Sequence, residues 1–211
     1  MICHESLWLP EQQSDWYDSP KSGKIYVNEN RKNLLDHHGL AVYRSHSNWD
    51  ALRGDGVPDQ AVSALNLGLV KVVAEQKFFR VLELPEPLPV GELFQKIEEG
   101  LGFRCCRLFG DPSTRIQRFA FLIGGFGENQ WHMPQAAHEM GAEAVILGEM
   151  SEFIVMSCLE MGMPVIETLH SISEIPAIRR QAEILSEALP DLPVHHIPSG
   201  STVYGCRIRG S

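Results

Sequence analysis

From residue 117 onward, short apolar runs alternate with longer segments in which apolar residues recur every three or four positions. The runs cover 119–123, 144–147 and 165–168, and the segments between them, about 130–140 and 151–162, have the helical period. Strands separated by helices in this way pair in parallel, because the helix returns the chain to the same edge of the sheet. The pattern therefore predicts a βαβαβ unit and an α/β fold class.

The end of the chain continues the pattern less regularly. A long amphipathic helix is expected over about 175–189, with Ser171 and Ser173 as candidate N-terminal caps. Two short strands should follow it, at about 194–197 and 203–208.

The first half shows shorter elements with the same two periods. A Pro at the first helical turn favours a helix from Pro58, and an apolar stripe predicts another that ends at Gly100 and Gly102. The expected elements are the end of a strand within 1–8, a buried strand at 39–45, a helix at 58–67, strands starting at 70–73 and covering 78–84, and a helix at 90–101.

Residues 10–33 are polar and rich in Pro, Ser, Asn, Asp and Lys, with little period. This composition predicts a long surface loop, with a short strand at 24–27. The sequence leaves open whether the loop closes over a site as a lid.

The composition and charge of the chain exclude several classes of protein and partner. The 211 residues are 44% hydrophobic and 21% charged, as in ordinary folded chains. A net charge of -9 makes nucleic acid an unexpected partner, since phosphate backbones attract basic surfaces. With no apolar run of about 18 residues and no basic stretch leading into an apolar one at the N-terminus, we expect a cytoplasmic protein without a membrane partner.

The five cysteines include no CxxC pair, so neither a disulfide framework nor a thiolate zinc site is expected. Cys105, Cys106, Cys158 and Cys206 are expected to be small buried residues, while Cys3 neighbours a histidine. The adjacent histidine pairs, at 37–38 and 195–196, are expected at the surface.

Three clusters of histidine and carboxylate residues follow strands. They are Cys3-His4-Glu5, the segment 46–50 with His46 and Asp50, and the segment 170–174. The carboxyl ends of parallel strands collect ligand groups at one edge of a sheet. A single histidine at a strand end is more often an ordinary hydrogen-bonded residue, so the joint placement is what indicates a metal site.

His170 and Glu174 stand four residues apart and would face the same side of a helix that includes both. Imidazole and carboxylate ligands, with one carboxylate bridging two cations, are the usual hydrolytic two-metal arrangement.

A glycine-rich turn, 124–127, lies between a strand and a helix. Its amides could hold a phosphate, but a tight turn is the simpler interpretation. The turn lacks GxGxxG spacing, so a nicotinamide-dependent oxidoreductase is only a minor hypothesis. Glu149 follows the second strand and is interpreted as a residue that lines the site or caps a helix.

Four runs of residues together resemble a known family. GLAVYRSHSNWDAL, IGGFG, AAHEMGAEAVILGEMSEF and PVIETLHSISEIPAI match, in order and spacing, the Nif-three-like dinuclear metal centre proteins, also named GTP cyclohydrolase type 2 homologues. The resemblance covers nearly the whole chain.

The resemblance implies a ligand set. The family's HTNLD-like motif falls on His46 to Asp50 and implies Asp50 as a ligand, with His46 close by. Its HxxxE motif falls on His170 and on Glu174, the expected bridge. Its first motif looks like His4-Glu5, where Glu5 replaces the second histidine of many members and makes the site more anionic.

The resemblance also implies the architecture. We expect one Nif-three-like domain over 1–211, with an N-terminal lobe at about 1–75 and a C-terminal lobe at about 76–211. The two interlocked α/β lobes would have mixed, largely parallel sheets and a metal cleft between them, and the chains would assemble into a ring-shaped homohexamer. Members usually begin with a helix and a strand ahead of the first ligand motif, so we expect a short form or a shortened start.

The leading hypothesis is a metal-dependent hydrolase in which His4, Glu5, Asp50, His170 and Glu174 hold two divalent ions of zinc, iron or manganese. His46 or Glu149 would act catalytically as a proton shuttle. A phosphorylated or nucleotide-like small molecule is the expected substrate, since a cationic cleft attracts anions. The alternative is a ring-shaped metal-binding scaffold or regulator that binds partner proteins and has no catalytic activity.

Overall fold

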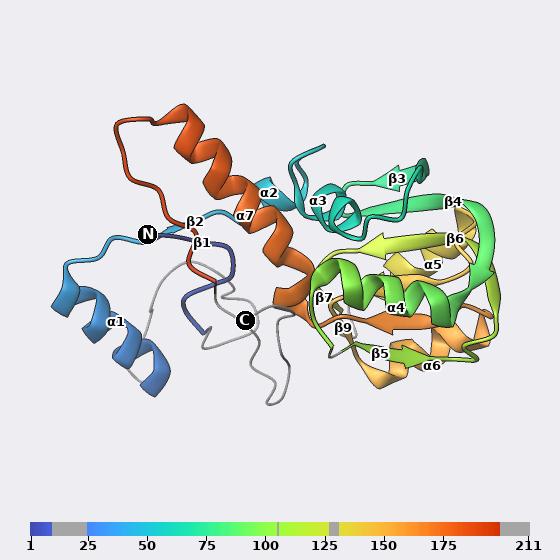
Figure 1. The fold of residues 1–211 in the computed structure, drawn as a ribbon. Coiled ribbons are helices and arrows are strands. Elements are labelled where there is room, and N and C mark those ends of the chain that lie inside the picture. Colours follow the sequence, from blue (N-terminus) through green and yellow to red (C-terminus); the bar gives the residue numbers. More distant parts are fainter. Residues whose placement is uncertain (10–24, 105, 127–130, 199–211) are drawn as a thin grey trace. The chain divides into compact units, whose positions relative to one another are not determined.

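The computed structural model describes residues 1–9, 25–104, 106–126 and 131–198 (Figure 1). The chain divides into two compact units, Met1–Trp49 and Asp50–Ser211. The boundary falls inside the short helix α2 (Ser47–Asp50). The expected division into family lobes at about residue 75 is a different partition and stays a prediction.

The first unit contains a two-stranded parallel ladder. Strand β1 (Ile2–Cys3) pairs with β2 (Tyr43–Arg44), with Ile2 opposite Tyr43 and Cys3 opposite Arg44. The buried strand expected at 39–45 is therefore wrong in length and burial, because only two of its residues pair and Tyr43 is 65% exposed.

A helix, α1 (Tyr26–His38), occupies positions where a polar loop and a strand at 24–27 were predicted. Only Asn28 of this helix is buried, and its side-chain amide donates to the Leu9 carbonyl and accepts from the Leu9 amide. The helix thus has no apolar stripe for sequence periodicity to detect. The rest of the predicted loop, 10–24, lies outside the described residues.

The second unit is built on a six-stranded mixed sheet in the order β3-β4-β6-β8-β10-β5. Its central strands β6, β8 and β10 are parallel and are joined through α5 and α6, so the predicted βαβαβ unit is confirmed. The strands are β3 (Lys71–Gln76), β4 (Phe79–Pro89), β5 (Arg107–Phe109), β6 (Arg115–Leu122), β8 (Val145–Leu147) and β10 (Val165–Glu167), and the helices are α5 (His132–Glu139) and α6 (Glu152–Glu160).

The two faces of this sheet carry separate apolar cores. Phe119 and Phe121 pack with α3 (Val57–Ala64) and α4 (Val90–Leu101), whereas Ala120 and Leu122 pack on the α5 and α6 side. Successive side chains of a strand point to opposite faces, so this alternation is what lets β6 build both cores. Both faces of the parallel strands are therefore covered by helices, as the α/β class predicts.

The long helix α7 (His170–Ala188) begins five residues before the predicted start at 175. Ser171 and Ser173 therefore lie inside the helix and do not cap it, and Leu169 occupies the capping position. The expected strand at 194–197 is absent from the described part of the C-terminal segment, 190–198, and 203–208 lie outside the described residues.

Two further short strands extend the sheet region toward His170. β7 (Gly125–Phe126) pairs in parallel with β9 (Glu149–Met150), beyond the carboxyl ends of β6 and β8. This ladder carries Glu149, one of the residues singled out by the sequence. Among the described ranges, no helix is long and apolar enough to cross a membrane.

Candidate metal centre

In the first unit, the β1–β2 ladder brings the histidines of the first two clusters together. His4 and His46 each follow one of the paired strands, and their ring centroids lie 4.8 Å apart. His4 is only 8% exposed, and its Nδ1 lies 2.8 Å from the carbonyl oxygen of Ser45. Since a carbonyl only accepts, Nδ1 carries the proton there and the neutral ring has its lone pair on Nε2.

Glu5 lies beside these rings. Its Oε1 is 3.4 Å from Nε2 of His46, although the Glu5 side chain is half exposed. Cys3 is a weaker candidate ligand, because burial raises the pKa of its thiol, partly offset by the charge of Arg44. Within the first unit, two imidazoles and one carboxylate therefore lie close together.

Asp50 follows His46 by four residues and ends α2. Its carboxylate is 3% exposed. Burial of a carboxylate is costly unless it is paired, hydrogen-bonded or bound to a metal. The role of Asp50 as a ligand stays a prediction.

In the second unit, His170 lies between two carboxylates. Its Nδ1 is 2.8 Å from Oε1 of Glu149, and its Nε2 is 3.0 Å from Oε1 of Glu174. Glu174 is 5% exposed, whereas the side chains of His170 and Glu149 are 34% and 47% exposed. The four-residue spacing places His170 and Glu174 on one side of α7, and Glu149 joins them from β9.

Three glycines allow this close approach. A Cβ at Gly125 would lie 2.0 Å from Oε1 of Glu149, and one at Gly148 would lie 2.6 Å from the Gly124 carbonyl oxygen and 2.7 Å from Cα of His170. Gly124 has a φ of +63°, which glycine adopts without strain. These glycines therefore make a tight turn against His170, while Gly127 of the same turn lies outside the described residues.

Leu169, immediately before His170, has φ 73° and ψ 140°, a conformation that side chains other than glycine rarely adopt. Its amide donates to the Gly148 carbonyl at 2.8 Å. Such a residue is strained by about 1–3 kcal/mol and persists where its surroundings hold it. Sequence reasoning missed this feature, which changes the direction of the chain where α7 begins.

The donor sets fit divalent metal ions. Groups of histidine and carboxylate side chains among the described residues could hold such an ion. Imidazole nitrogen and carboxylate oxygen suit zinc, iron and manganese. These groups do not include His37 and His38, which are exposed at the end of α1, or His195, which is exposed near the C-terminus.

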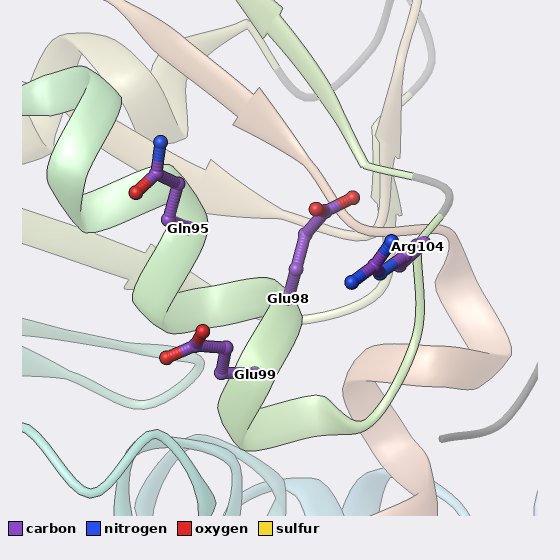
Figure 2. Close-up of a pocket in the computed structure, with 4 residues that line it drawn as sticks. All are labelled: Gln95, Glu98, Glu99 and Arg104. Atoms are coloured by element: carbon purple, nitrogen blue, oxygen red, sulfur yellow. The ribbon is translucent and has the colours of Figure 1, made fainter.

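A hollow elsewhere on the second unit has a different character. It lies along α4 and the segment after it, lined by Gln95, Glu98, Glu99 and Arg104 (Figure 2). None of these four side chains is buried, and of the two carboxylates only that of Glu98 lies on the side of Arg104, whereas Glu99 points away from it. We interpret this hollow as an ordinary solvated part of the surface, and no histidine lines it.

The Duf34/NIF3 (NGG1p interacting factor 3) family matches residues 18–202. The chain belongs to this family. The resemblance drawn from the four sequence runs is thereby confirmed, and the mixed α/β fold agrees with it.

Curated relatives of this family carry the name GTP cyclohydrolase 1 type 2 homolog. The one from Clostridium perfringens (strain 13 / Type A) is 30% identical over 156 residues, which cover 71% of this chain and 58% of the relative. The one from Clostridium acetobutylicum is 27% identical over 163 residues, covering 74% of this chain and 59% of the relative. The chain thus spans less than two thirds of the length of these relatives.

Solved structures show the same family fold. Protein ybgI, described as of unknown function, is 28% identical with a TM-score of 0.68, covering 81% of this chain and 68% of that one. A Bacillus cereus protein related to NIF3 is 14% identical with a TM-score of 0.75, covering 95% of this chain and 81% of that one. The second likeness concerns the fold alone.

Proposed function

We propose that the protein binds two divalent metal ions and hydrolyses a phosphorylated or nucleotide-like small molecule. The ligands are His4, Glu5, Asp50, His170 and Glu174, and the ions are zinc, iron or manganese. The observation that carries the proposal is His170 held between two carboxylates, with Glu174 buried on the same side of α7.

Divalent ions bound by these residues would supply a nucleophilic water at neutral pH. His46 and Glu149 are the groups proposed to move a proton, because each side chain is partly exposed and lies beside a proposed ligand. A general acid or base must combine such access to solvent or substrate with closeness to the reacting group. Glu149 combines partial exposure with a contact to His170 within the second unit, and this supports the proposed role.

The proposed substrate class follows from charge. A pair of divalent cations attracts anions even on a chain with a net charge of -9. The curated relatives' name, GTP cyclohydrolase 1 type 2 homolog, supports a nucleotide-like compound.

The remaining expectations are part of the same proposal. We propose a cytoplasmic homohexamer, to be tested by its mass in solution. Measured turnover separates the hydrolase from a ring-shaped metal-binding scaffold. A screen with phosphate esters and nucleotides should find an activity that a chelator and Asp50→Ala both abolish, whereas a metal-loaded chain with no turnover would favour the scaffold.

The metal assignment is tested with Glu174→Ala. Elemental analysis of wild-type protein purified without added metal or affinity tag should find close to two first-row metals per chain. Loss of the buried carboxylate should remove the metal while the circular dichroism spectrum stays that of a folded chain. Glu183→Ala, at an exposed glutamate of the same helix, is the matched control and should retain the metal. Full metal content in Glu174→Ala would refute the assignment.

A further inference from the structure

A buried carboxylate that the proposed function does not use lies on β10. Glu167 is 2% exposed, although its neighbours Val165 and Ile166 are apolar core residues. Its Oε1 accepts the backbone N–H of Met150 at 2.7 Å. Its Oε2 pairs with the guanidinium of Arg107, which stands opposite it on β5.

Each of the two residues joined by this hydrogen bond lies close to His170 or to its partner Glu149 along the chain. Met150 is the residue after Glu149, so the bond fixes the backbone of β9 where it presents the Glu149 carboxylate to Nδ1 of His170. Glu167 itself precedes His170 by only three residues, at the end of β10. The side chain thus joins the segment that carries His170 to the segment that carries its hydrogen-bond partner.

The orientation of the histidine depends on that partner. Both neighbours of the His170 ring are carboxylates that accept hydrogen bonds. Glu149, at 2.8 Å from Nδ1, is nearer than Glu174, at 3.0 Å from Nε2, so it favours the proton of the neutral ring on Nδ1. Nε2, on the side of Glu174, then carries the lone pair that a metal needs. Carboxylates that bind the second nitrogen of a ligating histidine fix its tautomer and its ring orientation.

We propose that Glu167 is a positioning residue for His170. By holding the Met150 amide, it keeps Glu149 against Nδ1 and directs Nε2 toward the metal site. This inference rests on the proposed function, in which His170 is a metal ligand. An apolar residue at position 167 would satisfy the packing of β10 but would leave the Met150 amide without its acceptor.

The test compares Glu167→Ala and Glu167→Asp with wild type and with Glu167→Gln. Glu167→Asp keeps the negative charge but moves the acceptor oxygen away from the Met150 N–H, because its side chain is one methylene shorter. Glu167→Gln loses the charge but keeps an oxygen that can accept from the Met150 N–H. Ile97→Val, in the core beneath α4, is a control that loosens packing without touching β9. Three properties are measured: the imidazole nitrogen shifts of His170 in metal-free protein, at alkaline pH where the ring has one proton; the Kd for zinc; and the urea midpoint.

We expect His170 of the wild type and of Glu167→Gln to carry its proton on Nδ1. Glu167→Ala and Glu167→Asp should lose this preference and bind zinc about 10- to 100-fold more weakly, the usual effect of losing such a partner. Ile97→Val should lower the urea midpoint and leave the nitrogen shifts and the Kd unchanged.

Two results would overturn the inference. One is a wild-type His170 with its proton on Nε2. The other is wild-type nitrogen shifts in Glu167→Asp or Glu167→Ala, with only a lower urea midpoint, which would make Glu167 a purely structural residue. A wild-type protein that binds no zinc, iron or manganese would defeat the proposed function instead, because the metal-free nitrogen shifts still report the positioning. Glu167→Asp carries the test if Glu167→Ala does not fold.

Discussion

Gly148→Ala should be among the most damaging single-methyl additions to the second unit. The new Cβ would lie 2.6 Å from the Gly124 carbonyl oxygen and 2.7 Å from Cα of His170. All of its nearest neighbours are backbone atoms, so no flexible side chain can give way. The two segments must retreat by about 0.8 Å before contacts reach the ordinary range that begins at 3.4 Å.

Retreat of either segment disturbs two hydrogen bonds, Gly148 N–H to Gly124 at 3.0 Å and Leu169 N–H to Gly148 at 2.8 Å. Overpacking of this kind costs about 1–3 kcal/mol, and contacts with backbone alone put Gly148→Ala near the upper end. For a chain of this size, about 3 kcal/mol corresponds to a fall in Tm of roughly 6–12 °C. This fall in Tm is measured by thermal melting followed by far-UV circular dichroism.

Gly162→Ala is the matched control. Gly162 has a φ of +77°, and no atom lies within 4 Å of the position that an added methyl would take, so alanine there costs only backbone strain of about 1 kcal/mol. The reasoning is refuted if Gly148→Ala melts no lower than Gly162→Ala, since steric crowding would then add nothing.

Two further predictions concern buried groups. Asp59→Ala should destabilise the second unit in urea unfolding, because Arg80, only 3% exposed, loses a two-point ion pair with atoms 3.0 and 3.1 Å apart. Arg80 keeps the Glu75 carboxylate at 3.4 Å, so the loss should be about 1.5–3 kcal/mol. Glu183→Ala, at an exposed pair, should cost less than about 1 kcal/mol, and equal losses in the two variants would contradict this expectation. Burial raises the pKa of Cys158 to about 11 from 9.0, so stability should fall as pH rises from 9 through 11, by about 2–3 kcal/mol. Because the unfolded thiol ionises first, this fall should be shallower in Cys158→Ala, and parallel pH curves would exclude the effect.

The regular part of the fold could be predicted because its signal is local. The apolar runs of the βαβαβ unit and the stripe of α4 each need only neighbouring residues to be recognised. Helix α1 has no such stripe, since only Asn28 is buried, and the three residues of β5 are too short to show alternation. The predicted start of α7 at residue 175 was wrong. Ser171 and Ser173 suggested N-terminal caps, whereas the chain turns into the helix at Leu169, through an unusual backbone conformation.

Some residues of the candidate site could likewise be predicted from the sequence, and others could not. His170 and Glu174 could be paired from their spacing, and Glu149 could be singled out, though not paired with His170, from its place after a strand. Glu167 could not be identified, because it lies within an apolar run and its partner is a backbone amide 17 positions away in sequence. A hydrogen bond to a backbone N–H leaves no residue type at the partner position for a motif to display.

The pairing of β8 with β10 places Val145 opposite Val165 and Leu147 opposite Glu167. Sliding one strand by a single residue would move it about 3.3 Å and would turn its side chains to the other face of the sheet. Such a misaligned chain would keep much of its secondary structure, but it would lose the 2.8 Å contact between Glu149 and His170. That contact is therefore a marker of correct strand alignment, and it can distinguish a properly folded second unit from a misassembled one that gives the same circular dichroism spectrum.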